Sequence, residues 1–160
     1  MSNEGIRLGH VQLRVRDLGR SKSFYEGLLG LPVREAGRGV VFLGLGPSHH
    51  EIALHAVGED AAQSPPLGLG LSHIAFEVAD RPALLRVYRT LADAGVRVSG
   101  VDLGVSWSLY FHDPDGNEVE VYCDTRRASG GRPYWEGRGQ TLNLRRAETI
   151  VAAEDAAVAG

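Results

Sequence analysis

The stretch HVQLRVRD at residues 10–17 returns as HIAFEVAD at residues 73–80, so a histidine, three alternating apolar residues and a closing aspartate occur twice. In each copy the apolar residues take every second position, which is the period of a strand with one packed face and one open face. The two histidines fall on the open face at equivalent positions. Self-similarity of this kind predicts two copies of one supersecondary unit.

Each copy continues into a segment with helical spacing. After Asp17 the apolar residues Phe24, Tyr25, Leu28 and Leu29 form a stripe that is expected to end at Gly30, and after Asp80 a second helix is expected to run to about Gly95. Short β-rich segments follow each helix: residues 39–45 and 51–57 in the first copy, and residues 96–101, 106–112 and 118–123 in the second. The pattern predicts an α+β fold of two βαβββ modules.

The domain boundaries follow from composition. The first module is expected at residues 5–58 and the second at residues 72–124, joined by a linker at about 58–71 that is rich in glycine and proline. Neither half is long enough for a good core alone, so we expect one domain over residues 5–124, with a cupped mixed sheet. Residues 125–160 are expected to form a partly flexible extension, with a frayed or disordered helix at 147–159.

Bulk composition excludes several classes of function. The net charge is −3, which gives no basic footprint for nucleic acid or an anionic membrane surface. The single cysteine excludes an internal disulfide framework. No apolar stretch approaches the ~18 residues of a membrane span, and the first residues do not resemble a secretory signal. We therefore expect a cytoplasmic protein.

The paired histidines are the candidate metal ligands. Of the six histidines in the chain, His55 and His112 have ordinary structural explanations, whereas His10 and His73 occupy matching positions in the two repeats. A third ligand could come from the strand that follows the turn DPDGN at 113–117, where either Glu118 or Glu120 faces the open side. Two imidazoles and one carboxylate form the facial triad of non-haem Fe(II) oxygenases.

These motifs together resemble the vicinal oxygen chelate superfamily, which includes glyoxalase I, bleomycin and fosfomycin resistance proteins and extradiol dioxygenases. The resemblance covers roughly residues 5–124 and rests on the stretches LGH at 8–10, FY at 24–25, LGL at 29–31, SHIAFEV at 72–78 and DPDGNEVE at 113–120. It implies that the metal ligands are His10, His73 and Glu120, since the family's glutamate is the eighth residue counted from the first aspartate of the turn.

Among the branches of the superfamily, the chain is most similar to single-domain catechol 2,3-dioxygenase-like proteins. The stretch HHEIAL at 49–54 implies that His50 acts as an acid/base near dioxygen, and the position of Tyr110 implies contact with a substrate oxygen. The stretch GVS at 104–106 implies that Ser106 and the preceding Leu103 lie at the substrate. These enzymes usually carry a histidine where this chain has Leu103, and an apolar side chain cannot supply its hydrogen bond.

The resemblance implies a metal-dependent extradiol dioxygenase that acts on a catechol-type substrate with O2, with Fe(II) or alternatively Mn(II), as a homodimer. Two alternatives stay open. A glyoxalase-like isomerase or lyase would need a fourth protein ligand, and alignment puts Ala53 at that position, with Glu51 two residues away. A non-catalytic protein that binds small molecules, as in bleomycin resistance, would be compatible with Leu103.

Overall fold

The computed structural model describes residues 5–63, 65, 68–128 and 131–159, with side chains described up to residue 153. The chain divides into two compact units, Met1–Pro65 and Pro66–Gly160. Each unit contains one copy of the repeat. None of the described helices combines the length and the apolar character needed to cross a membrane.

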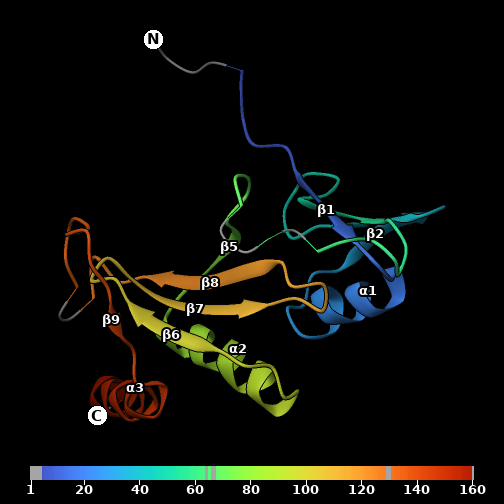
Figure 1. Ribbon diagram of the computed structural model, residues 1–160. Coiled ribbons are helices and arrows are strands. Elements are labelled where there is room, and N and C mark those ends of the chain that lie inside the picture. Colours follow the sequence, from blue (N-terminus) through green and yellow to red (C-terminus); the bar gives the residue numbers. More distant parts are fainter. Residues whose placement is uncertain (1–4, 64, 66–67, 129–130, 160) are drawn as a thin grey trace. The chain divides into compact units, whose positions relative to one another are not determined.

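The first unit contains one helix and a four-stranded sheet (Figure 1). Its elements are β1 (Val11–Val15), α1 (Leu18–Gly27), β2 (Val33–Gly37), β3 (Val40–Leu43) and β4 (Ile52–Ala56). The strand order is β1-β4-β3-β2, with β1 parallel to β4 and the other neighbours antiparallel. The strand β2 was not located from the sequence. The helix α1 ends at Gly27, three residues before the expected stop, and Leu28 is its C-cap.

The second unit repeats this arrangement and extends it. Its elements are β5 (His73–Val78), α2 (Arg81–Asp93), β6 (Ser99–Asp102), β7 (Ser106–His112), β8 (Glu118–Asp124), β9 (Gln140–Thr141) and α3 (Leu144–Ala159). The strand order is β5-β8-β7-β6-β9, with β5 parallel to β8. Two mixed sheets with their crossover helices confirm the predicted α+β class and the two βαβββ modules. That residues 5–124 form one domain stays a prediction.

The aspartate that closes each repeat explains how strand passes into helix. Asp17 is the N-cap of α1 and accepts a hydrogen bond from the backbone N–H of Arg20 at 2.6 Å. Asp80 is the N-cap of α2 and accepts from the N–H of Ala83 at 2.7 Å. Both satisfy a donor that the first helical turn leaves unpaired. The repeat therefore encodes a strand together with its exit into a helix.

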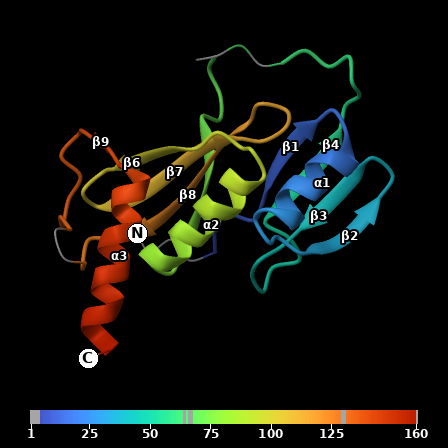
Figure 2. The same ribbon diagram turned by 90° about the horizontal axis from the view of Figure 1, so that it is seen from below.

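Helices α1 and α2 each cover one face of their own sheet (Figure 2). In the second unit, Leu84 and Leu85 of α2 are buried, as are Leu109 and Val119 on the facing strands. The guanidinium of Arg81 at the start of α2 lies 4.2 Å from the ring centre of Trp107. Because side chains alternate across a strand, the opposite face carries the polar set of each strand. That polar face holds the candidate site.

The C-terminal extension adds structure to the second unit. The strand β9 pairs with β6, and α3 packs against α2 with Ala147 and Val151 buried. The side chains of Arg89 and Glu148 form an ion pair at 2.7 Å between the two helices. The helix α3 begins at Leu144, three residues before the frayed helix or disordered end that was expected at residues 147–159.

Candidate metal and substrate site

The turn before β8 sets which carboxylates reach the polar face. The carboxylate of Asp113 accepts hydrogen bonds from the N–H of Asp115 at 2.9 Å, the N–H of Asn117 at 2.8 Å and the side-chain amide of Asn117 at 2.8 Å. Gly116 completes the turn with φ of +85°, which favours glycine. This turn joins β7 to β8 and fixes their antiparallel register, in which Glu120 lies opposite Tyr110. On its other side β8 pairs in parallel with β5, so that Glu118 lies opposite His73.

Glu120 is the centre of the candidate site in the second unit. Its carboxylate is buried, with 7% of the residue exposed. His73 Nε2 lies 3.0 Å from Glu120 Oε2, and the hydroxyl of Tyr110 donates to Glu120 Oε1 at 2.9 Å. The rings of His73 and Tyr110 meet edge to face, with centres 5.7 Å apart. Two side chains, one from each strand that flanks β8, therefore converge on one buried carboxylate.

Glu118 does not share this environment. Its carboxylate lies 4.0 Å from the other ring nitrogen of His73, and 37% of its side chain is exposed, against 9% for Glu120. A solvated carboxylate holds a cation weakly because water competes for it. Burial therefore distinguishes the two acids, whereas their spacing in the sequence did not.

The donors in this unit fit a divalent metal of borderline character. An imidazole nitrogen and a carboxylate oxygen are the ligand types that Fe(II) and Mn(II) accept, and here they lie within 3.0 Å of each other. Burial, and then the hydrogen bond to Glu120, raise the pKa of Tyr110 to about 12. The phenol therefore keeps its proton at neutral pH and remains a hydrogen-bond donor at the rim of the site.

The remaining predicted ligand, His10, belongs to the first unit, together with His50. The rings of His10 and His50 lie with centres 4.6 Å apart, and Phe42 packs on His50 at 4.5 Å. Within neither unit alone, among the described residues, do three or more His, Cys, Asp or Glu side chains gather in a way that could hold a metal ion. The complete set of His10, His73 and Glu120 therefore stays a prediction.

A chain of polar contacts, not foreseen from the sequence, orients His50. Its Nδ1 lies 2.9 Å from Nδ1 of His49, whose Nε2 lies 3.2 Å from the carboxylate of Glu35. A proton on His49 Nε2 would face the carboxylate, so His49 Nδ1 would accept from His50 and leave His50 Nε2 without a proton. That Nε2 atom is buried and has no hydrogen-bond partner in the described part of the chain. Burial, then the charges of His10 and His49, lower the pKa of His50.

The position of a fourth protein ligand is occupied by alanine. In the second unit Glu120 lies opposite Ala75, two residues after His73, and in the first unit the equivalent pair is Ala53 opposite Gln12. Glu51 cannot substitute, because its carboxylate accepts from the N–H of Leu45 at 2.7 Å and of Gly46 at 3.4 Å. These bonds lower the pKa of Glu51 and hold its side chain on the β3–β4 loop.

The two residues expected at the substrate differ in their surroundings. Ser106, 8% exposed, lies on the polar face, and its hydroxyl is 3.3 Å from that of Ser108. Leu103 lies in the β6–β7 turn, where its N–H donates to the carbonyl of Ser106 at 2.9 Å. Its side chain lies against Gly139, close enough that a Cβ there would come within 2.9 Å of it. Leu103 therefore packs against the C-terminal extension.

Comparison with known proteins identifies the family. The model of the Glyoxalase/Bleomycin resistance protein/Dioxygenase superfamily matches residues 7–121. The paired modules and the His73–Glu120 arrangement are thus found in a chain that belongs to this superfamily, as the motifs predicted.

Curated relatives include enzymes of two kinds. The chain is 36% identical over 121 residues to biphenyl-2,3-diol 1,2-dioxygenase 3 of Rhodococcus globerulus, covering 74% of this chain and 63% of that protein. It is 30% identical over 132 residues to catechol-2,3-dioxygenase of Bacillus subtilis, covering 81% and 46%. It is 29% identical over 123 residues to lactoylglutathione lyase of Salmonella typhimurium, covering 72% and 91%. The chain thus spans less than two thirds of these two dioxygenases.

A solved structure supports the same fold. A glyoxylase/bleomycin resistance protein/dioxygenase domain from a Frankia species is 28% identical and superposes with a TM-score of 0.62, covering 74% of this chain and 98% of that one. The family model ends at residue 121, so the whole extension at 125–160 lies beyond the family pattern.

Proposed function

We propose that this protein is a metal-dependent extradiol dioxygenase that opens an aromatic ring beside a vicinal diol, using O2. The observation that supports this most is the convergence of His73 and Tyr110 on the buried carboxylate of Glu120. His73 and Glu120 would supply one imidazole ligand and one carboxylate ligand, with the phenol of Tyr110 beside them. His10 of the first module would be the third ligand. Similarity to two diol dioxygenases points to the same reaction class.

The metal would be Fe(II), with Mn(II) as the alternative, held by His10, His73 and Glu120. When bound, it would supply a Lewis-acidic, redox-active centre with open positions for the two diol oxygens and for O2. Tyr110, whose hydroxyl donates to Glu120 at 2.9 Å in the metal-free protein, would turn that proton to a substrate oxygen and so orient the ring. Overall, both atoms of O2 enter the product and the ring bond next to the diol breaks.

His50 would move the proton. Its buried Nε2 carries no hydrogen-bond partner among the described residues, and its lowered pKa keeps the imidazole neutral at pH 7. A neutral imidazole with a free lone pair can take a proton from the diol and return it later to the product. His49 and Glu35 would hold the ring in that tautomer.

A glyoxalase-like isomerase or lyase is the second candidate, because lactoylglutathione lyase is among the relatives. The buried Ala53 and the engaged Glu51 argue against it, since they leave the first module without a carboxylate at the fourth position. Binding without catalysis is the third candidate, and it would account for Leu103 in place of the usual histidine.

The test is O2 uptake after anaerobic loading with Fe(II), against a panel of catechols, with the yellow ring-opened product followed in parallel. His10→Ala should abolish uptake, and His55→Ala is the matched control, because His55 is an exposed histidine on β4 of the same unit. Iron that binds to the protein without uptake on any diol would refute the dioxygenase proposal. Turnover of a glutathione hemithioacetal by the same sample would then favour the isomerase.

A further inference from the structure

A cavity of about 420 Å³ lies in the second unit, on the polar face of the sheet. Its floor comes from the strands: Glu77 on β5, Tyr122 and Asp124 on β8, and Ser106 at the start of β7. Its wall comes from the C-terminal extension, through the three consecutive residues Pro133, Tyr134 and Trp135. The wall lies outside the part of the chain that the family model matches.

The cavity continues the face that carries Glu120. Tyr122 follows Glu120 by two residues on β8, and Glu77 lies opposite Tyr122 just as Ala75 lies opposite Glu120. Two residues along a strand correspond to about 7 Å. A single ring held at Glu120 by its diol would therefore end where the cavity begins, and a larger substituent would extend into it.

The aromatic wall is anchored on both sides. The N–H of Arg132 donates to the carbonyl of Gly104 at 2.8 Å, and Gln140 of β9 pairs with Asp102 of β6. Gly104 has φ of +78°, which favours glycine, and a Cβ there would come within 2.9 Å of the Arg132 side chain. Between these anchors Tyr134 and Trp135 are 80% and 63% exposed. Two large aromatic side chains that are exposed on a segment anchored at both ends indicate a binding surface.

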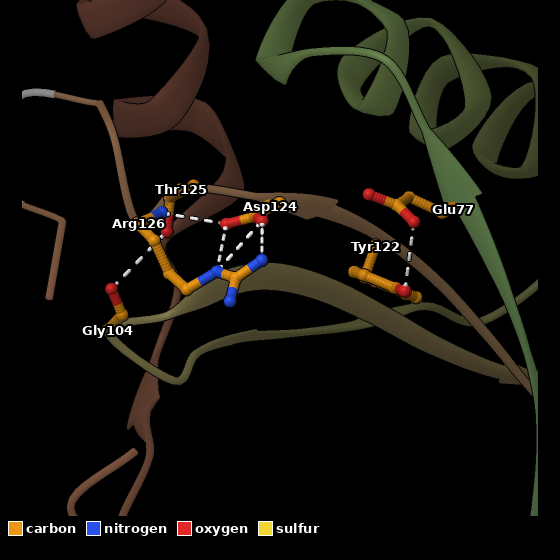
Figure 3. Close-up of polar contacts among 6 residues, drawn as sticks. All are labelled: Glu77, Gly104, Tyr122, Asp124, Thr125 and Arg126. Carbon is orange, nitrogen blue, oxygen red and sulfur yellow. Dashed lines mark hydrogen bonds and ion pairs between the residues drawn. The ribbon is translucent and has the colours of Figure 1, made fainter. Parts of the chain in front are cut away.

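The charges in the cavity exclude anions. Arg126 donates through Nε to both oxygens of Asp124, at 3.0 and 2.9 Å, and this pair holds the pKa of Asp124 at about 2 (Figure 3). The carboxylate of Glu77 accepts a hydrogen bond from the hydroxyl of Tyr122 at 3.2 Å (Figure 3). Two carboxylates and one guanidinium leave one net negative charge, which repels a carboxylate on the ligand.

We propose that this cavity is a subsite for a flat, uncharged or cationic group, and that Tyr134 and Trp135 of the C-terminal extension determine which substrates fit. The assignment of this cavity to the distal part of the substrate rests on the proposed function. The binding of a flat group between the strands and the aromatic wall does not rest on it, because such binding requires neither the metal nor the diol.

The test uses the metal-free full-length chain and three probes without a vicinal diol: phenol, 2-naphthol and 2-naphthoate, titrated by calorimetry at pH 7. The second ring should improve affinity about tenfold for 2-naphthol over phenol, from the apolar area it buries. Trp135→Ala should cost up to about tenfold in affinity for 2-naphthol. Ile150→Ala, at an exposed apolar position of α3, is the matched control in the same extension and should change nothing.

A double variant tests the charge argument. Replacing Glu77 with glutamine and Asp124 with asparagine together leaves Arg126 as the charged group of the cavity. The double variant should bind 2-naphthoate at least tenfold better than the natural chain does. Equal affinities for phenol and 2-naphthol, or an unchanged affinity in Trp135→Ala, would overturn the subsite. Failure of O2 uptake would leave these results standing, so the two proposals fail separately.

Discussion

Removal of one hydroxyl group tests whether Glu120 is held as the geometry indicates. Tyr110→Phe deletes the donor that lies 2.9 Å from a carboxylate that is 7% exposed, and little water can replace it. Hydrogen bonds to charged groups contribute about 1.5–3 kcal/mol, and a buried acceptor left without its donor pays its desolvation. We therefore expect the free energy of unfolding of the metal-free protein to fall by about 2 kcal/mol.

The matched control removes the hydroxyl of Tyr122, which lies on the same face of the sheet, two residues after Glu120 on β8. Tyr122 donates to Glu77 at 3.2 Å in an exposed position, so Tyr122→Phe should cost less than about 0.5 kcal/mol. Urea denaturation of both variants and the parent, followed by circular dichroism, gives the three free energies. Equal losses in the two variants would refute the reasoning, since they would mean that Glu120 is as well solvated as Glu77.

Three further predictions follow from the fold and the electrostatics. Asp80→Ala should lower the free energy of unfolding by about 1 kcal/mol, whereas Asp80→Asn should stay within a few tenths, because asparagine also caps a helix. Folding raises the pKa of Tyr110 from 10.0 to about 12, so its contribution to stability is fully present below pH 10 and is lost as the pH rises through 12. Between pH 10 and 12, the free energy of unfolding of Tyr110→Phe should depend less on pH than that of the parent protein. An equal pH dependence in the two proteins would contradict the assignment of the raised pKa to Tyr110. Val151→Asp should cost about 2–3 kcal/mol by burying a charge beneath α3, whereas Ile150→Asp, its exposed neighbour, should be nearly neutral in thermal melts.

Most of the fold could be predicted from the repeat. Its alternating apolar residues predicted the strands β1 and β5. Its closing aspartates mark where α1 and α2 begin, and the structure identifies them as helix N-caps. The strand β7 occupies the residues expected for it, since the fixed turn at 113–117 and the turn at 103–105 bound it on both sides. The strand β2 could not be found in this way, because four of its five residues are exposed and the pattern VREAG has no apolar alternation.

The site was predictable in its residue types but only in part in its geometry. Spacing left Glu118 and Glu120 equivalent, and their difference in burial comes from the strands on either side of β8, which no local pattern contains. His49 and Glu35 were missed for a related reason. Glu35 belongs to β2, fourteen positions before His49, and only the folding of β2 beside β3 brings its carboxylate to that imidazole.

The two modules also explain why one of them holds a carboxylate and the other does not. Side chains at matched positions of neighbouring parallel strands point the same way and lie about 5 Å apart, so they share space. In the second unit the pair is Ala75 with Glu120, and in the first it is Gln12 with Ala53, so each pair joins one long polar side chain to one alanine on the opposite strand. Gln12 is exposed, whereas Ala53 is buried. The first module therefore offers no carboxylate at the position that matches Glu120, and a fourth carboxylate ligand there would require substitution of Ala53.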